Sequence, residues 1–119
     1  MTANRPGAPR PEDLTRLFVE RANAADVDGM LDLYEPDAVM AFPPGQLTVG
    51  HAKIRALFEQ MVAARPAFQP EEPLQTLVVG DIALTATRAR DEAGARAQVV
   101  RRQPDGTWKR VLDRPDFRA

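Results

Sequence analysis

Asp113 is a candidate for proton transfer. It lies in the segment "RVLDR", within the last expected strand. A carboxyl group surrounded by apolar side chains has a raised pKa and can act as a general acid or base. Arg110 and Arg114 are close in sequence, so an ion pair of purely structural value is the alternative interpretation.

His51 is the second candidate for acid–base chemistry, and it is the one histidine of the chain. It begins an expected helix, where it is either a proton shuttle at the mouth of a pocket or simply an exposed side chain. One histidine without cysteines cannot supply the ligands of a typical transition-metal site, so no metal is expected. No glycine-rich phosphate loop or hydrolase motif is present either, and no cofactor is expected. Any site should therefore be an enclosed pocket with a few polar groups.

Five further residues are candidates for the lining of such a pocket. Tyr34 either reaches a ligand with its hydroxyl or packs its ring and sends the hydroxyl to water or backbone. Gln98 either binds a ligand through its amide or faces outward from the sheet, because the neighbouring valines leave its face undecided. Met40, Phe58 and Met61 line the pocket if it is hollow and form the core if it is filled.

The composition bounds the class of protein. The chain has 119 residues, enough for one domain, with 44% hydrophobic and 28% charged residues. The net charge of −1 provides no basic field for nucleic acid or anionic lipid. No apolar run approaches the roughly 20 residues of a membrane span. The absence of cysteine excludes disulfides and agrees with the cytoplasmic location that we expect.

The first residues differ in character from the rest of the chain. The segment "MTANRPGAPRP" has three prolines and a glycine and lacks the apolar core of a secretion signal. We expect a flexible tail over residues 1–10 and a single domain over residues 11–119. An arm that packs on a partner subunit is the alternative for the tail.

Helices precede strands along the chain. Apolar residues recur at helical spacing over residues 11–25, 26–34 and 51–65, and the third of these patterns is the clearest. Pro36 should end the second helix, which Tyr34 closes. Strands are expected at 37–42 and then, separated by turn signals such as Gly80-Asp81 and "PDG", within residues 74–79, 82–90, 95–103 and 107–114. This order predicts an α+β fold with an antiparallel meander and helices on one face of the sheet.

Two segments carry a resemblance to a known family. The stretch "LYEPDAVMAFPPGQLTVGHAKIRALFEQM" and the hairpin "PDGTWKRVLD" resemble the SnoaL-like and ketosteroid-isomerase-like branch of the nuclear transport factor 2-like superfamily. The resemblance implies a cystatin-like α+β cone. In such a cone a curved antiparallel sheet wraps around the long helix, two further helices precede it, and the open end is an apolar pocket. Phe42 would line the wall of that pocket.

The resemblance also allows the catalytic positions of the steroid isomerases to be compared with the residues of this chain. Ketosteroid isomerases place a carboxylate base at the position of Phe42, a tyrosine at that of Phe18 and a second acid near Gln98. A phenyl ring neither accepts a proton nor donates a strong hydrogen bond. Steroid isomerisation by the usual residues is therefore not expected, although Phe18 would still line the pocket.

Two functions remain open at this point. The first is an acid–base enzyme of isomerase, cyclase or hydrolase type that acts on an apolar, ring-bearing metabolite through Asp113 and His51. The second is a non-catalytic dimeric module that holds a small apolar molecule or a partner protein. Because relatives pair through the outer face of the sheet, the resemblance implies a homodimer in either case.

Overall fold

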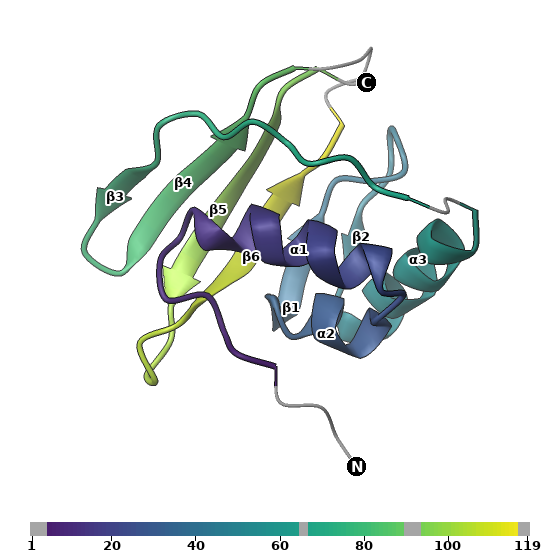
Figure 1. The fold of residues 1–119 in the computed structure, drawn as a ribbon, viewed down its shortest axis with the longest axis horizontal. Helices are drawn as coiled ribbons and strands as arrows, with labels where there is room; N and C mark the ends of the chain where they lie inside the picture. Colours follow the sequence, from purple (N-terminus) through teal and green to yellow (C-terminus); the bar gives the residue numbers. More distant parts are fainter. Residues whose placement is uncertain (1–4, 65–66, 90–93, 117–119) are drawn as a thin grey trace.

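Three helices lie on one side of a single sheet in the computed structural model, which describes residues 5–64, 67–89 and 94–116 (Figure 1). The helices are α1 (Asp13–Asn23), α2 (Val27–Leu31) and α3 (His51–Ala64). The long third helix is confirmed, and its apolar stripe turns Ile54 and Phe58 fully into the core. The expected end of that helix at residues 65–66 lies outside the described residues.

The second helix is shorter than predicted. Asp26 caps it by accepting a hydrogen bond from the backbone of Gly29, as its position suggested. However, the carbonyl of Leu33 accepts a hydrogen bond from the backbone of Arg110 at 2.7 Å. The chain has joined the sheet by then, so Tyr34 begins the first strand instead of closing the helix.

The sheet has six strands in the order β2-β1-β6-β5-β4-β3. The predicted antiparallel meander is confirmed for β3 to β6. β1 and β6 pair in parallel, so the sheet is mixed rather than wholly antiparallel. Turn signals predict the pairing of strands that follow one another in sequence. They could not predict the pairing of β1 with β6, because most of the chain lies between these two strands. The strands are β1 (Tyr34–Met40), β2 (Thr48–Val49), which was not predicted, β3 (Leu77–Val79), β4 (Ile82–Thr87), β5 (Arg96–Arg102) and β6 (Trp108–Arg114).

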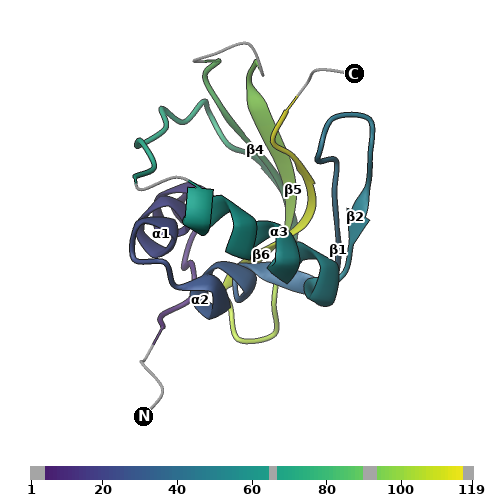
Figure 2. The ribbon, with the colours of Figure 1, turned by 90° about the vertical axis from the view of Figure 1, so that its right-hand side faces the viewer.

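The sheet curves around the helices, as the cone predicted from the resemblance requires. Figure 2 shows the strands bending past α3 while α1 and α2 lie on the same side. The core lies between the helices and this inner face, where Leu14, Met30 and Phe58 are fully buried. None of the helices in the described residues is long and apolar enough to cross a membrane.

Residues 5–10 pack on the domain, which differs from the expected start of order near Pro11. Ala8 is fully buried and pairs with Trp108, whose backbone nitrogen donates to the carbonyl of Ala8 at 3.0 Å. Arg5 forms an ion pair with Asp26 at 2.7 Å. These contacts hold the segment against the base of the sheet. Residues 1–4 lie outside the described residues, as does most of the expected turn at 91–94.

Candidate functional site

The carboxylate of Asp113 lies on the inner face of the sheet and is buried. The hydroxyl of Tyr34 donates to its Oδ2 at 2.5 Å, and the side-chain amide of Gln98 donates to its Oδ1 at 3.1 Å. The hydroxyl of Thr85 then donates to the Oε1 of Gln98 at 2.8 Å. Asp113, Tyr34 and Gln98, which were singled out in the sequence, therefore form one buried hydrogen-bonded chain.

Arg110 extends this chain toward the helices. Its Nη1 donates to the hydroxyl of Tyr34 at 3.0 Å and lies 3.9 Å from Asp113 Oδ2, while its Nη2 donates to Thr15 Oγ1 at 3.3 Å. The guanidinium also lies over the rings of Phe18 and Tyr34, 5.2 and 5.5 Å from their centroids. Burial lowers the pKa of Arg110, but Tyr34 and Asp113 outweigh burial and raise it. The guanidinium of Arg110 therefore stays positively charged although it is buried.

A β-bulge brings Arg110 and Asp113 to the same face. Residues three apart in a regular strand point to opposite faces. In β6 the register shifts, because Arg110 pairs with Val100 and Leu112 pairs with Val99. The extra residue re-aims the strand, so that Arg110 and Asp113 both point inward.

Aromatic and apolar side chains from the helices and from β1 surround this polar chain. The rings of Phe18, Tyr34 and Phe58 contact one another, with centroids 5.5 to 6.4 Å apart. Met40 and Phe58 are buried, and Phe18, Phe42 and Met61 are partly buried against the core. The interior thus has an apolar helix side and a polar sheet side.

The expectation of an apolar interior is wrong for the sheet side. The strands β4 to β6 turn several polar residues inward, and β-sheet positions of this kind are stable only when hydrogen-bonded. Sequence analysis missed Arg110 as a site residue in its own right, and it missed Thr85. The signal that could have found them is the period of two between inward-facing positions along a strand. In β6 the bulge interrupts this period. The buried polar residues of these strands are Thr85, Thr87, Gln98, Arg110 and Asp113.

Tyr34 is held as a neutral hydrogen-bond donor. Burial raises the pKa of its hydroxyl first, and the negative charge of Asp113 raises it further. Arg110 lowers the pKa by a smaller amount that does not offset the other two causes. The hydroxyl can therefore orient the carboxylate of Asp113 without ionising.

His51 contacts the backbone of Tyr34. Its Nε2 lies 2.8 Å from the carbonyl oxygen of Tyr34, and the side chain is half-buried at the start of α3. The structure therefore links His51 to Tyr34 and does not place its ring on the carboxylate of Asp113. Within the residues that the structure describes, no group of acidic or histidine side chains could hold a metal ion.

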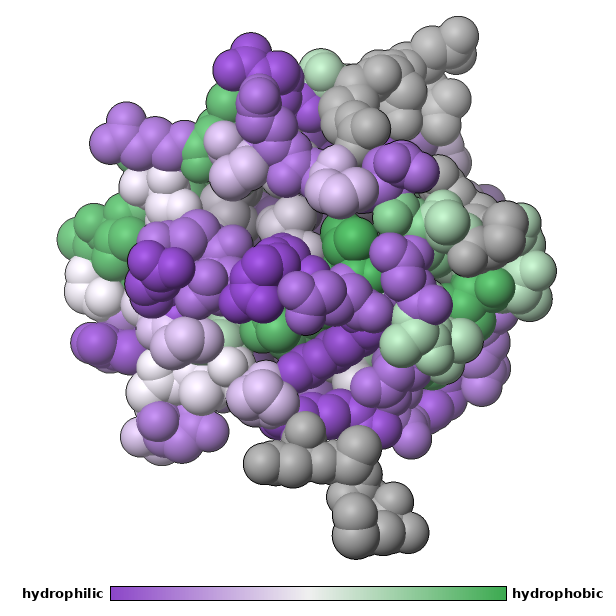
Figure 3. Space-filling model, in the orientation of Figure 1, coloured by the Kyte–Doolittle hydropathy of each residue, from purple (hydrophilic) through white to green (hydrophobic). Residues whose placement is uncertain are grey.

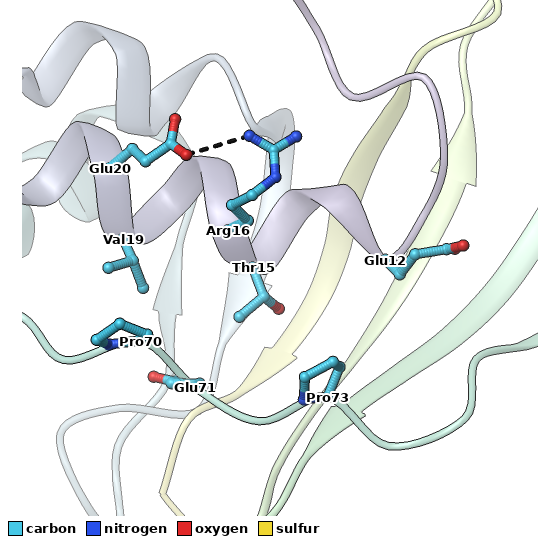
Figure 4. A pocket seen from close by; sticks show the side chains of 8 residues that line it. All are labelled: Glu12, Thr15, Arg16, Val19, Glu20, Pro70, Glu71 and Pro73. Atoms are coloured by element: carbon cyan, nitrogen blue, oxygen red, sulfur yellow. Dashed lines mark hydrogen bonds and ion pairs between the residues drawn. The ribbon is translucent and has the colours of Figure 1, made fainter.

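A groove lies on the outside of α1, where residues 70–73 run beside the helix (Figure 4). Its volume is about 440 Å³. Thr15 and Val19 point from α1 toward this segment, whereas Arg16 and Glu20 point away and pair with each other at 3.1 Å. The groove is lined by Glu12, Thr15, Arg16, Val19, Glu20, Pro70, Glu71 and Pro73.

The outer face of the sheet carries an apolar row that crosses all six strands. Each member is the direct cross-strand partner of the next, so they share one face. Several members are 41 to 57% exposed, and a hollow of about 340 Å³ lies over the middle of the row. Figure 3 shows apolar side chains gathered at the end of the molecule where β3 lies. The outer row consists of Val49, Val39, Leu112, Val99, Leu84 and Leu77.

Comparison with known proteins agrees with this architecture. The family model described as SnoaL-like domain matches residues 15–112. No curated protein sequence matches the chain.

Solved structures similar to this chain share its fold at low sequence identity. A protein of Thiobacillus denitrificans, named after the association domain of calcium/calmodulin-dependent protein kinase type II, is 22% identical. The match covers 93% of this chain and 98% of that one, with a TM-score of 0.72. A ketosteroid isomerase-like protein of Erwinia carotovora atroseptica is 17% identical over 87% and 89% of the two chains, with a TM-score of 0.66. A nuclear transport factor 2-like protein of Novosphingobium aromaticivorans with a cystatin-like fold is 21% identical over 87% and 78%, with a TM-score of 0.62.

Proposed function

Because the chain belongs to the SnoaL-like domain family, we propose that it is a small-molecule enzyme in which Asp113 transfers a proton. The substrate class is an apolar, ring-bearing metabolite. The observation that carries this proposal is the buried carboxylate of Asp113, which accepts hydrogen bonds from Tyr34 and Gln98, while the ring of Tyr34 packs against two further aromatic rings. A positioned carboxylate in such surroundings is suited to general acid–base catalysis.

The neighbours of Asp113 have separate roles in this proposal. Tyr34 and Gln98 fix the direction of the carboxylate, because each donates to a different oxygen. The rings of Phe18 and Phe58 pack against the ring of the substrate. Arg110, 3.9 Å from the carboxylate, stabilises negative charge that develops when a carbon acid loses its proton.

His51 has an indirect role in the proposed reaction. Its ring holds the carbonyl of Tyr34 at 2.8 Å, so it positions the tyrosine that orients Asp113. The usual isomerase positions carry Phe18, Phe42 and Gln98 in this chain, so the proposed chemistry excludes steroid isomerisation by that set of residues.

Proton exchange on a ring-bearing ketone tests the role of Asp113. The full chain is incubated in D₂O with 2-tetralone, and loss of the α-proton signal is followed by NMR against a protein-free blank. Asp113→Asn should slow the catalysed exchange at least about 100-fold, because the amide cannot accept the proton. Glu59→Gln, on the exposed side of α3, is the matched control and should exchange at the wild-type rate. Full activity of Asp113→Asn would overturn the assignment.

A non-catalytic binding module is the second candidate, and one observation favours it. Both oxygens of Asp113 already accept hydrogen bonds within the chain, and Arg110 balances the charge. Such a network can serve to shape a binding pocket without taking part in chemistry. A molecule that copurifies with the protein, and that native mass spectrometry finds chemically unchanged after long incubation, would support this candidate over the enzyme.

The outer face of the sheet supports a homodimer as part of either function. The apolar outer row is continuous across six strands, and exposed apolar surface of this extent is typical of an interface. Two copies that pack these faces together would cover the row in both chains. Sedimentation at micromolar concentration should give a dimer, and a monomer would contradict the proposal.

A further inference from the structure

We propose that the groove between α1 and residues 70–73 binds a ligand that bears a carboxylate, and that this carboxylate takes the unpartnered edge of Arg110. The inference goes beyond the proposed function and does not require catalysis by Asp113. The ligand would place its ring in the groove between α1 and residues 70–73.

The guanidinium of Arg110 has an edge whose hydrogen-bonding capacity is largely unused. Its Nε is buried and has no hydrogen-bond partner, although the residue is only 4% exposed. The neighbouring Nη2, on the same edge, makes one long bond of 3.3 Å to Thr15. A carboxylate matches two parallel donors of this kind, and an unsatisfied buried donor is costly. The edge is therefore suited to a carboxylate that the chain itself does not supply.

Glu71 already brings a carboxylate close to this place. Its Oε1 accepts a hydrogen bond from Thr87 at 3.1 Å, and its Oε2 lies 3.9 Å from Arg96 Nε. Its charge is also among those that favour the protonated form of Arg110. The side chain is 21% exposed, so it has a route into solvent. Glu71 thus competes with a ligand carboxylate for the same positive surroundings.

The groove provides room for the rest of the ligand. Thr15 connects the two regions, because it accepts the bond from Arg110 and also lines the groove. Val19, Pro70 and Pro73 give the groove apolar walls that fit a flat ring. Glu20 on the rim is paired with Arg16, as described above. A ring with a carboxylate is therefore a better match than a cation or a purely apolar molecule.

Calorimetric titration of the full chain with benzoate and benzamide tests the proposal. The two probes share size and ring, and only benzoate carries the charge. Benzoate should bind at least about tenfold more tightly than benzamide. Equal binding of the two probes would overturn the proposal.

Glu71→Gln tests the competition directly. Removal of the competing charge should tighten benzoate binding about three- to tenfold and leave benzamide unchanged. Glu59→Gln removes an exposed charge on α3, outside the groove, so it should leave both affinities at the wild-type value. A Glu71→Gln variant that binds benzoate no better than the wild type would count against the role of Glu71.

Arg110→Lys tests the edge of the guanidinium. Lysine keeps the charge but lacks the two parallel donors, so benzoate should fall to the affinity of benzamide. If this buried substitution unfolds the chain, the comparison of benzoate with benzamide on the wild type still decides the proposal. Benzoate binding without proton exchange would refute only the proposed enzyme, whereas exchange without preference for benzoate would refute only the carboxylate ligand.

Discussion

Two neighbouring rows of residues, on opposite faces of the sheet, differ in the reverse of the usual sense. The outer row is apolar and largely exposed, whereas the inner row, one residue along each strand, is mostly polar and buried. Folding of a single chain favours the opposite arrangement. The inner row belongs to the proposed polar site, and the outer row to the proposed dimer interface. The inner row consists of Thr48, Met40, Asp113, Gln98 and Thr85.

The two rows are adjacent in register, which makes their difference sensitive to strand alignment. Leu112 and Asp113 are neighbours in β6, and Leu84 and Thr85 are neighbours in β4. If one strand slipped by one residue, its apolar side chains would turn to the inner face and its polar side chains to the outer face. The slipped strand would then place apolar side chains beside the polar side chains of its neighbours. The hydrogen bonds from Thr85 through Gln98 to Asp113 cross three strands and hold them in the observed register.

Replacement of Arg110 by methionine should have the largest effect on stability, because it removes the positive charge that pairs with Asp113 in the inner network. Asp113 would keep its hydrogen bonds but lose the cation at 3.9 Å, and the cost of a broken buried pair is about 3–5 kcal/mol of unfolding free energy. Urea denaturation followed by fluorescence of Trp108, the one tryptophan, measures it. Arg55→Met removes an exposed pair with Asp28 and should cost no more than about 1 kcal/mol. Equal losses in the two variants would show that the inner network contributes no special stability.

Charged substitutions at two outer positions should separate the chains of the proposed dimer. Leu84→Glu with Leu112→Glu places like charges in the middle of the outer row, where they would meet the partner. We expect the dissociation constant to rise at least about 100-fold, or about 2.7 kcal/mol. Both side chains are about half exposed in the single chain, so the fold should persist. Sedimentation measures the change, with Lys53→Glu on α3 as the control. An unaffected dimer would place the interface elsewhere.

A pair of inverse substitutions in β4 compares the faces at neighbouring residues. Thr85→Val keeps the shape of the side chain but leaves Gln98 Oε1 buried without its donor, at a cost of about 1–2 kcal/mol. Leu84→Thr makes the outer neighbour more polar and should change the stability of the monomer by less than about 0.5 kcal/mol. Urea denaturation at a concentration below the dimer transition measures both. A larger loss for Leu84→Thr would reverse the assignment of the faces.

Much of this architecture could be predicted from local sequence signals, and the polar site only in part. The turn at Gly80-Asp81 and the stripe of α3 correctly predicted the meander and the long helix, because each depends on residues close in sequence. The face of Gln98 could not be decided, since Val99 and Val100 are both apolar. The pairing of Arg110 with Asp113 depends on the bulge in β6, which follows from packing between distant strands.

Tyr34 should stay un-ionised over the pH range in which an exposed phenol ionises. This is the smallest expected effect. Because burial and Asp113 raise its pKa, the fold favours the neutral hydroxyl. The stabilisation is fully present below the unfolded value of about 10 and is lost as the pH rises through the higher folded value. Tyr34 is the one tyrosine of the chain, so absorbance at 295 nm reports it alone. Phenolate should appear only together with unfolding, as Trp108 fluorescence reports it. Phenolate near pH 10 in a folded chain would mean that water reaches the hydroxyl of Tyr34, which is buried in the structure.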